Sequence, residues 1–238
     1  MTDLLCQADA YLRVFTATVT GTDGEGRVTL DRSAFYPTGG GQPHDTGTLR
    51  WDGGQAKVVA VTKEGAEVWH RLEGDVPPAG TEVEGEIDWD RRYILMRTHT
   101  ALHVLCGVIW NEWGKAVTGG NMEPGSARMD FEFDPLPERF GPTVEELVNA
   151  ELAKGRPVEV AFLPRAEAVL DDALIRTKVN LVPESVPEIR VVDIVGLDKQ
   201  ADGGTHVAST SEVGRIRVVK TESKGKAFKR IRIELVDA

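Results

Sequence analysis

The sequence is organised around residues 90–106, which read DRRYILMRTHTALHVLC. Apolar residues recur along this stretch at helical spacing, which predicts one long helix with Asp90 as its N-cap and Gly114 just beyond its end. His99 and His103 are four residues apart and therefore leave the same helical face about one turn apart. From that spacing two imidazoles can bind one zinc ion, although two core histidines would give the same pattern.

A second candidate element for the same site is the glycine-rich stretch QADGGTH at residues 200–206. It provides Asp202 and His206, again four residues apart, so the two stretches together offer four possible metal ligands. Cys106 shares the helical face of His103. It is interpreted as a buried thiol, with a spare metal ligand as the alternative.

Turn residues divide residues 11–88 into short segments with strand-like patterns and no long helical pattern between them. This spacing is typical of a small antiparallel β-barrel or sandwich. We therefore expect an N-terminal β-barrel domain over residues 1–88 and a second domain over residues 89–238. The predicted strands of the first domain are residues 12–19, 27–30, 47–51, 56–61, 67–71 and 81–87.

Within the first domain, residues 35–47 read FYPTGGGQPHDTG. Three consecutive glycines can take backbone angles closed to other residues and let a ligand approach the main chain. The stretch is a candidate binding loop, and a plain hairpin turn is the alternative. It lacks the lysine and the following Ser or Thr of a phosphate-binding loop.

Residues 89–238 mix helical and strand patterns, which predicts an α+β fold: a two-layer α/β sandwich with a mostly antiparallel sheet. Thr143 and Glu146 form a predicted capping box at the start of a second helix, which ends at Gly155. A third helix is expected at residues 165–176. The predicted strands are residues 127–133, 158–163, 189–195, 214–221 and 227–235.

Charge is unevenly spread along the chain. The net charge is −10, yet residues 215–238 carry 8 basic and 3 acidic side chains. Local cations bind phosphate whatever the total charge, so this closing hairpin is a candidate nucleic-acid surface, with a solvated strand face as the alternative. The candidate nucleic-acid-binding residues are Lys220, Lys224, Lys226, Lys229 and Arg230.

The remaining composition points to a cytoplasmic protein. The N-terminus lacks the order of a signal peptide, and no apolar run approaches the roughly 20 residues that span a bilayer, so no membrane partner is expected. Two cysteines far apart in the sequence give no disulfide framework. Oligomeric state is left open.

Four motifs together resemble those of the free-standing alanyl-tRNA editing proteins of the AlaX group. They are GGGQP-x-D-x-G at residues 39–47, HTA-x-H at 99–103, GGTHV at 203–207 and the basic K-x-E-x-KGK at 220–226. The chain is also similar to the editing domain of alanyl-tRNA synthetase and to the related second additional domain of threonyl-tRNA synthetase. The resemblance covers nearly the whole chain.

The resemblance implies a zinc site whose ligands here are His99, His103, Asp202 and His206, with the three histidines as the catalytic residues. Asp202 stands where the family pattern usually has a cysteine. A carboxylate keeps the charge of a thiolate, so three histidines and one aspartate form a sound zinc site. Alternatively, Asp202 lies behind the ligands and leaves three histidines and a water.

The implied reaction is hydrolysis of the ester that joins serine, or glycine, to the 3′ end of tRNA(Ala). A synthetase pocket sized for alanine discriminates poorly against either, so a second hydrolytic site is required. Zinc either activates a water or positions the aminoacyl adenosine. Thr38 and Gln42 are candidates for binding the serine hydroxyl, and with Gly40 and Gly41 they form the predicted substrate-binding set.

Two rival functions are poor fits and one stays open. A zinc metalloprotease of the H-E-x-x-H type needs Glu where residue 100 is Thr. A complete synthetase is excluded by length, since no room remains for an aminoacylation domain. The open alternative is a zinc-stabilised RNA-binding module without catalysis.

Overall fold

The computed structural model describes residues 2–168, 174, 187–223, 225 and 227–236. It divides into two compact units, Met1–Tyr93 and Ile94–Ala238, and the division falls inside helix α2 (Trp89–Trp113). The predicted domain boundary between residues 88 and 89 stays a prediction. In the described part of the chain, no helix is long and apolar enough to cross a membrane.

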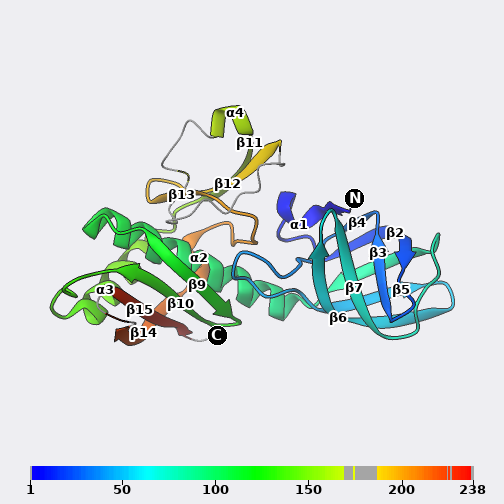
Figure 1. Ribbon diagram of the computed structural model, residues 1–238, viewed down its shortest axis with the longest axis horizontal. Coiled ribbons are helices and arrows are strands. Elements are labelled where there is room, and N and C mark those ends of the chain that lie inside the picture. The colour runs from blue at the N-terminus through cyan, green and yellow to red at the C-terminus, as the bar shows by residue number, and fades with distance from the viewer. Residues whose placement is uncertain (1, 169–173, 175–186, 224, 226, 237–238) are drawn as a thin grey trace. The chain divides into compact units, whose positions relative to one another are not determined.

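The first unit is a closed six-stranded barrel, drawn in blue to cyan in Figure 1. Its strands follow one another around the barrel in the order β2-β3-β7-β6-β5-β8, and every pairing is antiparallel. The predicted barrel and its six strands are confirmed. The bounds are β2 (Val14–Thr22), β3 (Arg27–Leu30), β5 (Gly47–Trp51), β6 (Gly54–Glu64), β7 (Glu67–Gly74) and β8 (Glu82–Ile87).

Alternation of buried and exposed residues fixes which face of each strand lines the barrel. In β8 the burial alternates without a break, and residue 85 on its inner face is a glycine. A Cβ on Gly85 would lie 2.3 Å from the ring of Phe15, so only glycine lets that aromatic ring fill the core. Beside the barrel, two short strands, β1 (Asp3–Leu4) and β4 (Arg32–Ser33), pair in parallel, and α1 spans Leu5–Ala8.

A buried ion pair connects the glycine-rich stretch to the start of α2. Asp45 and Arg92 have fully buried side chains, and the guanidinium of Arg92 bonds the Asp45 carboxylate and the carbonyls of Ala34 and Ala10. The helix itself is capped by Asp88, whose Oδ1 accepts the backbone N–H of Arg91 at 3.3 Å. The predicted cap at Asp90 was therefore wrong by two residues.

The second unit contains two antiparallel sheets and the long part of α2. A four-stranded sheet has the order β14-β15-β10-β9, and a three-stranded sheet has the order β11-β12-β13 (Figure 1). The predicted α+β class is confirmed. The strands are β9 (Val117–Glu123), β10 (Ser126–Glu132), β11 (Val158–Pro164), β12 (Glu188–Ile194), β13 (Asp198–Ala201), β14 (Arg215–Ser223) and β15 (Phe228–Val236).

Polar side chains attach the helices to the larger sheet. Asn149 of α3 (Phe140–Leu152) bonds the backbone N–H and C=O of Ile216 in β14, both at 2.9 Å. Thr98 of α2 accepts the N–H of Gly125 in the β9–β10 turn at 3.1 Å. Helices and sheet therefore form the two layers that the sequence predicted.

Several element assignments were wrong. β9 and β13 were not predicted, because β9 contains adjacent glycines and β13 is only four residues long. Helix α3 begins at Phe140, so the predicted capping box at Thr143 lies inside it, and the structure has its capping box at Ser209 before the 3-10 turn Thr210–Val213. The predicted helix at 165–176 is described as α4 (Arg165–Ala168), and most of its remainder lies outside the described residues.

Candidate metal centre

Four side chains of the second unit converge on one point. His99 and His103 on α2, Asp202 directly after β13 and His206 in the following loop offer ligand atoms that all lie within 4.8 Å of one another. The ring centroid of His206 lies 4.3 Å from that of His99 and 4.6 Å from that of His103. The three histidines are buried, so the cluster is largely shielded from solvent.

Backbone contacts fix the position of Asp202. Its N–H donates to the carbonyl of Arg190 in β12 at 3.1 Å, and Nη1 of Arg190 donates to its carbonyl at 2.8 Å. Its Oδ2 accepts the N–H of Gly204 at 2.7 Å and lies 3.0 Å from Nε2 of His206. The carboxylate is therefore held on the histidines by the strand behind it.

Thr100 orients His206. Nδ1 of His206 lies 3.2 Å from the hydroxyl oxygen of Thr100, which also accepts the N–H of Val207 at 3.3 Å. Nε2 of His206 is left to face Asp202. On the other side of the carboxylate, Nε2 of His99 lies 3.7 Å from Oδ1 of Asp202. Both histidines thus present the same ring nitrogen to the centre.

Burial sets the charge of the cluster. It lowers the pKa of His99 to about 4, and burial together with His99 lowers the pKa of His206 well below its usual value. Burial alone would raise the pKa of Asp202, but the neighbouring histidines lower it well below its usual value. At neutral pH His99 and His206 are therefore neutral imidazoles beside the Asp202 carboxylate, which is the deprotonated state that metal binding requires.

The pKa of His103 is shifted in the opposite direction. Burial lowers it, but the carboxylates of Asp198 and Asp202 outweigh burial and raise it overall. Nitrogen from imidazole and oxygen from carboxylate are ordinary zinc ligands, so the donor set fits the predicted ion. Cys106 is buried and is not one of the four clustered side chains. That the four bind a metal stays a prediction.

The glycine loop lies in the first unit and forms a tight turn. Gly39 and Gln42 exchange backbone hydrogen bonds of 3.1 and 2.9 Å, and Gly40 and Gly41 have φ of 57° and 83°. These positive angles favour glycine, which explains the triplet. Thr38 is exposed, and its N–H donates to the carbonyl of Val61 at 3.1 Å. A substrate-binding role for Thr38, Gly40, Gly41 and Gln42 stays a prediction.

The candidate nucleic-acid residues differ in how freely they face solvent. Arg230 is 9% exposed and donates two hydrogen bonds of 2.7 Å to Asp130, directly across from it in β10, so it ties β15 to β10. Nζ of Lys220 lies 2.7 Å from Glu222, and Nζ of Lys229 lies 3.0 Å from Oγ of Ser223. Lys224 and Lys226 lie outside the described residues.

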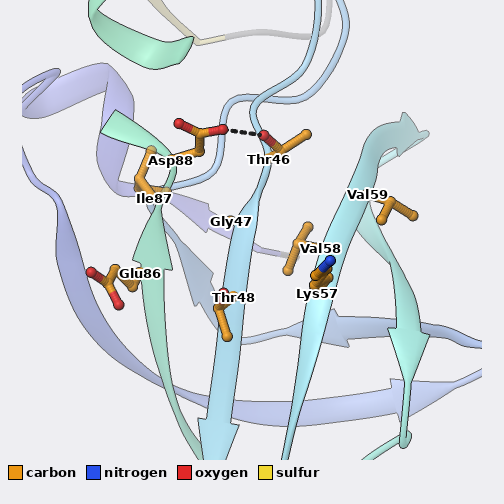
Figure 2. A pocket seen from close by; sticks show the side chains of 9 residues that line it. All are labelled: Thr46, Gly47, Thr48, Lys57, Val58, Val59, Glu86, Ile87 and Asp88. Atoms are coloured by element: carbon orange, nitrogen blue, oxygen red, sulfur yellow. Dashed lines mark hydrogen bonds between the residues drawn. The ribbon is translucent and has the colours of Figure 1, made fainter. Parts of the chain in front are cut away.

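The barrel also has a surface hollow of about 460 Å³, shown in Figure 2. Its lining comes from β5, β6 and β8 and includes Thr48, Lys57 and Glu86, with Thr46 bonded to Asp88 at one edge. None of the residues lining it is a histidine or a cysteine, so it is not a second site of the predicted kind.

Sequence reasoning missed three residues that support the cluster: Thr100, Arg190 and Asp198. Thr100 lies between the two histidines of the HTA-x-H motif, and a search for hydroxyls beside predicted ligands would have found it. Asp198 precedes Asp202 by four residues, and a search for carboxylates near the predicted ligands in the sequence would have found it. Arg190 has no sequence signal, because its contact depends on how β12 pairs with the loop.

Two family models match the chain. One, described as class II (A) tRNA synthetases, matches residues 12–91, and one described as the second additional domain of threonyl and alanyl tRNA synthetases matches residues 189–232. The first range includes the glycine loop, and the second includes Asp202 and His206. The fold and the matched segments thus define a protein built from tRNA synthetase modules.

Similarity to whole proteins is more specific. The chain is 36% identical over 243 residues to an alanyl-tRNA editing protein AlaX-M of Methanosarcina barkeri, covering 100% of both chains. It is 37% identical to that of Saccharolobus solfataricus, covering 97% of this chain and 98% of that one. It is also 42% identical to an alanine–tRNA ligase of Pyrobaculum calidifontis, covering 90% of this chain and 24% of the ligase. The chain therefore belongs to the alanyl-tRNA editing protein family.

Proposed function

We propose that this protein is an aminoacyl-tRNA deacylase that hydrolyses tRNA(Ala) carrying serine, or glycine, in the cytoplasm. The observation that carries the proposal is the buried cluster of His99, His103, Asp202 and His206, which brings two stretches far apart in the sequence to within 4.8 Å. Family membership supports tRNA editing as the setting, since relatives matched over nearly their whole length are named alanyl-tRNA editing proteins.

In this proposal the four side chains hold a zinc ion. Zinc bound there supplies a Lewis acid for ester hydrolysis. The protein's contribution is to orient the ligands: Thr100 turns His206 inward, and Arg190 holds the Asp202 loop. Because most of the cluster is buried, bulk water is largely excluded and electrostatic interactions are strong there.

Selection of serine is assigned to the glycine loop. A hydroxyl at Thr38 or an amide at Gln42 can hydrogen-bond the serine hydroxyl, and an alanine ester leaves that polar group unpaired. We expect Thr38→Val to reduce the ratio of serine to alanine release by about tenfold, the value of one hydrogen bond. Thr48→Val, on β5, is the matched control. An unchanged ratio in Thr38→Val would remove Thr38 from this role.

Binding of tRNA is assigned to the hairpin of β14 and β15. Lys220 and Lys229, with Lys224 and Lys226 of the same hairpin, would contact phosphates near the acceptor end. Arg230 contributes by holding the hairpin on β10.

The test is deacylation of Ser-tRNA(Ala), with Gly-tRNA(Ala) and Ala-tRNA(Ala) alongside. We expect rapid release of serine, its loss after chelator treatment, and recovery on adding zinc. A protein that binds the tRNA but leaves the ester intact in every condition would contradict the proposal. That result would favour the alternative of a zinc-stabilised RNA-binding module.

A further inference from the structure

A second carboxylate, outside the four clustered side chains, lies beside His103. Oδ2 of Asp198, the first residue of β13, is 3.2 Å from Nδ1 of His103, and the two side chains are 0% and 7% exposed. This distance joins one ring nitrogen of His103 to a buried carboxylate that is not one of the four clustered side chains. In the described part of the chain, no hydrogen-bond partner other than Asp198 is found for that nitrogen.

The helix is shaped to receive this carboxylate. Gly107 follows His103 by one turn of α2, and a Cβ added there would lie 3.0 Å from Cβ of Asp198 and 3.0 Å from Cγ of Leu197. A glycine inside a helix is destabilising relative to alanine. Here it lets the start of β13 lie directly against the helix at the level where Asp198 meets His103.

Asp198 and Asp202 are joined by one short element. β13 runs from Asp198 to Ala201, and it is fixed by antiparallel pairing of Asp198 with Ile194 and of Ala201 with Val191. A rigid strand thus sets the distance between a carboxylate inside the cluster and a carboxylate outside it. The position of Asp198 depends in turn on the close contact of the start of β13 with Gly107 of α2.

We propose that Asp198 is a positioning residue for the metal centre. Its carboxylate accepts a hydrogen bond from the Nδ1–H of His103, which keeps the proton on Nδ1 and leaves the lone pair of Nε2 for the site formed by His99, Asp202 and His206. Gly107 makes the room for this arrangement. The proposal rests on the metal site of the proposed function and adds the residue that selects the ring tautomer of one ligand.

The physical basis is general. A histidine that binds a metal usually donates its other ring N–H to a carboxylate or carbonyl, which fixes the ring and makes the ligating nitrogen more basic. Loss of such a partner weakens metal binding about 10- to 100-fold. Asparagine keeps the shape of Asp198 but also offers an N–H to Nδ1, which favours the wrong tautomer.

The experiment measures zinc affinity by competition with a chromogenic chelator, using the full chain after metal removal. We expect Asp198→Asn and Asp198→Ala to weaken zinc binding about 10- to 100-fold. Gly107→Ala, which keeps the carboxylate but displaces it, should also weaken binding. Asp193→Asn is the matched control, because Asp193 pairs with Lys199, the neighbour of Asp198, and so lies on the other face of the sheet.

A spectroscopic readout separates positioning from simple stability. Long-range ¹H–¹⁵N spectra of the zinc-loaded protein should show the Nδ1–H tautomer for His103 in the wild type and a changed state in Asp198→Asn. Zinc affinity equal to wild type in both Asp198 variants, or ligation of His103 through Nδ1, would overturn the proposal. His206→Ala tests the site itself: if that variant also binds zinc normally, the proposed function fails, whereas loss there with normal binding in Asp198→Asn overturns only the positioning role.

Discussion

Both units bury histidine, but they use it in different ways. In the barrel, Nε2 of His70 lies 2.8 Å from the hydroxyl of Ser33 and Nδ1 lies 3.3 Å from the carbonyl of Val28, so both ring nitrogens have a partner. In the second unit, three imidazoles and a carboxylate direct their nitrogens and oxygens at one another. The comparison teaches that burial alone does not indicate a metal ligand. A candidate metal site is indicated instead when several ring nitrogens and carboxylate oxygens converge on one point.

Buried carboxylates show the same contrast. Asp45 in the barrel is matched by the guanidinium of Arg92, so its charge is neutralised within the unit. Asp202 has a cation at a greater distance, with Nη1 of Arg190 3.8 Å from its Oδ2, and lies among three buried histidines. The first arrangement neutralises a buried charge within the fold, and the second is the one that we propose binds a cation.

Breaking the barrel's ion pair should have the largest effect on stability. Arg92→Ala leaves the Asp45 carboxylate buried without its partner, which costs about 3–5 kcal/mol. Arg50→Ala, which removes a solvent-exposed partner of Glu86, should cost at most about 1 kcal/mol. Urea unfolding of both variants measures the difference. Equal losses would show that the Arg92 pair is no more important than a surface contact.

Replacing a histidine should change the zinc content of the protein only when that histidine belongs to the cluster of the second unit. His206→Ala should lose zinc and reduce deacylation at least about a hundredfold, since the metal supplies several kcal/mol to such reactions. His70→Gln should retain one zinc per chain wherever circular dichroism shows a folded protein. Elemental analysis of both variants decides the matter, and zinc lost from His70→Gln but kept by His206→Ala would reverse the account.

Acid should destabilise the barrel through His70. Burial lowers the pKa of His70 from 6.5 to about 4, so between those values the unfolded chain binds a proton that the folded chain excludes. The free energy of unfolding should therefore fall by about 3 kcal/mol as the pH drops from 6.5 to 4. Subtracting the pH profile of His70→Gln isolates this contribution. Parallel profiles for the two proteins would contradict it.

The smallest effect is expected at the surface of the closing hairpin. Lys220→Ala and Lys229→Ala should each weaken tRNA binding and reduce the slope of log affinity against log salt by about 1. Lys57→Ala, in the barrel hollow of Figure 2, is the control and should leave the slope unchanged. Filter-binding titrations at several salt concentrations give the slopes, and an equal change in all three variants would argue against a hairpin interface.

The sequence predicted the barrel because its signal is local. Each strand alternates and each ends at a turn residue, so six strands could be assigned before their pairing was known. The ligand set depended on two pairs of residues, each spaced four apart, which periodicity and resemblance together identified. These features need no knowledge of how distant segments meet.

The sequence did not predict features that depend on distant contacts. β13 is a strand only because Asp198 and its neighbours pair with β12, and Arg190 reaches Asp202 only through that pairing. The role of Gly107 depends on a side chain ninety-one positions later. The cap of α2 was wrong for a different, local reason, since Asp88 and Asp90 are equally good caps in sequence.

The central claim is that side chains from two remote stretches bind one zinc ion through nitrogen and oxygen. X-ray absorption at the zinc edge of the reconstituted protein tests it directly. We predict a four-coordinate shell of nitrogen and oxygen at about 2.0–2.2 Å, with imidazole scattering from three histidines. A sulfur at about 2.3 Å, which would place Cys106 on the metal, or a shell without imidazole would contradict the account.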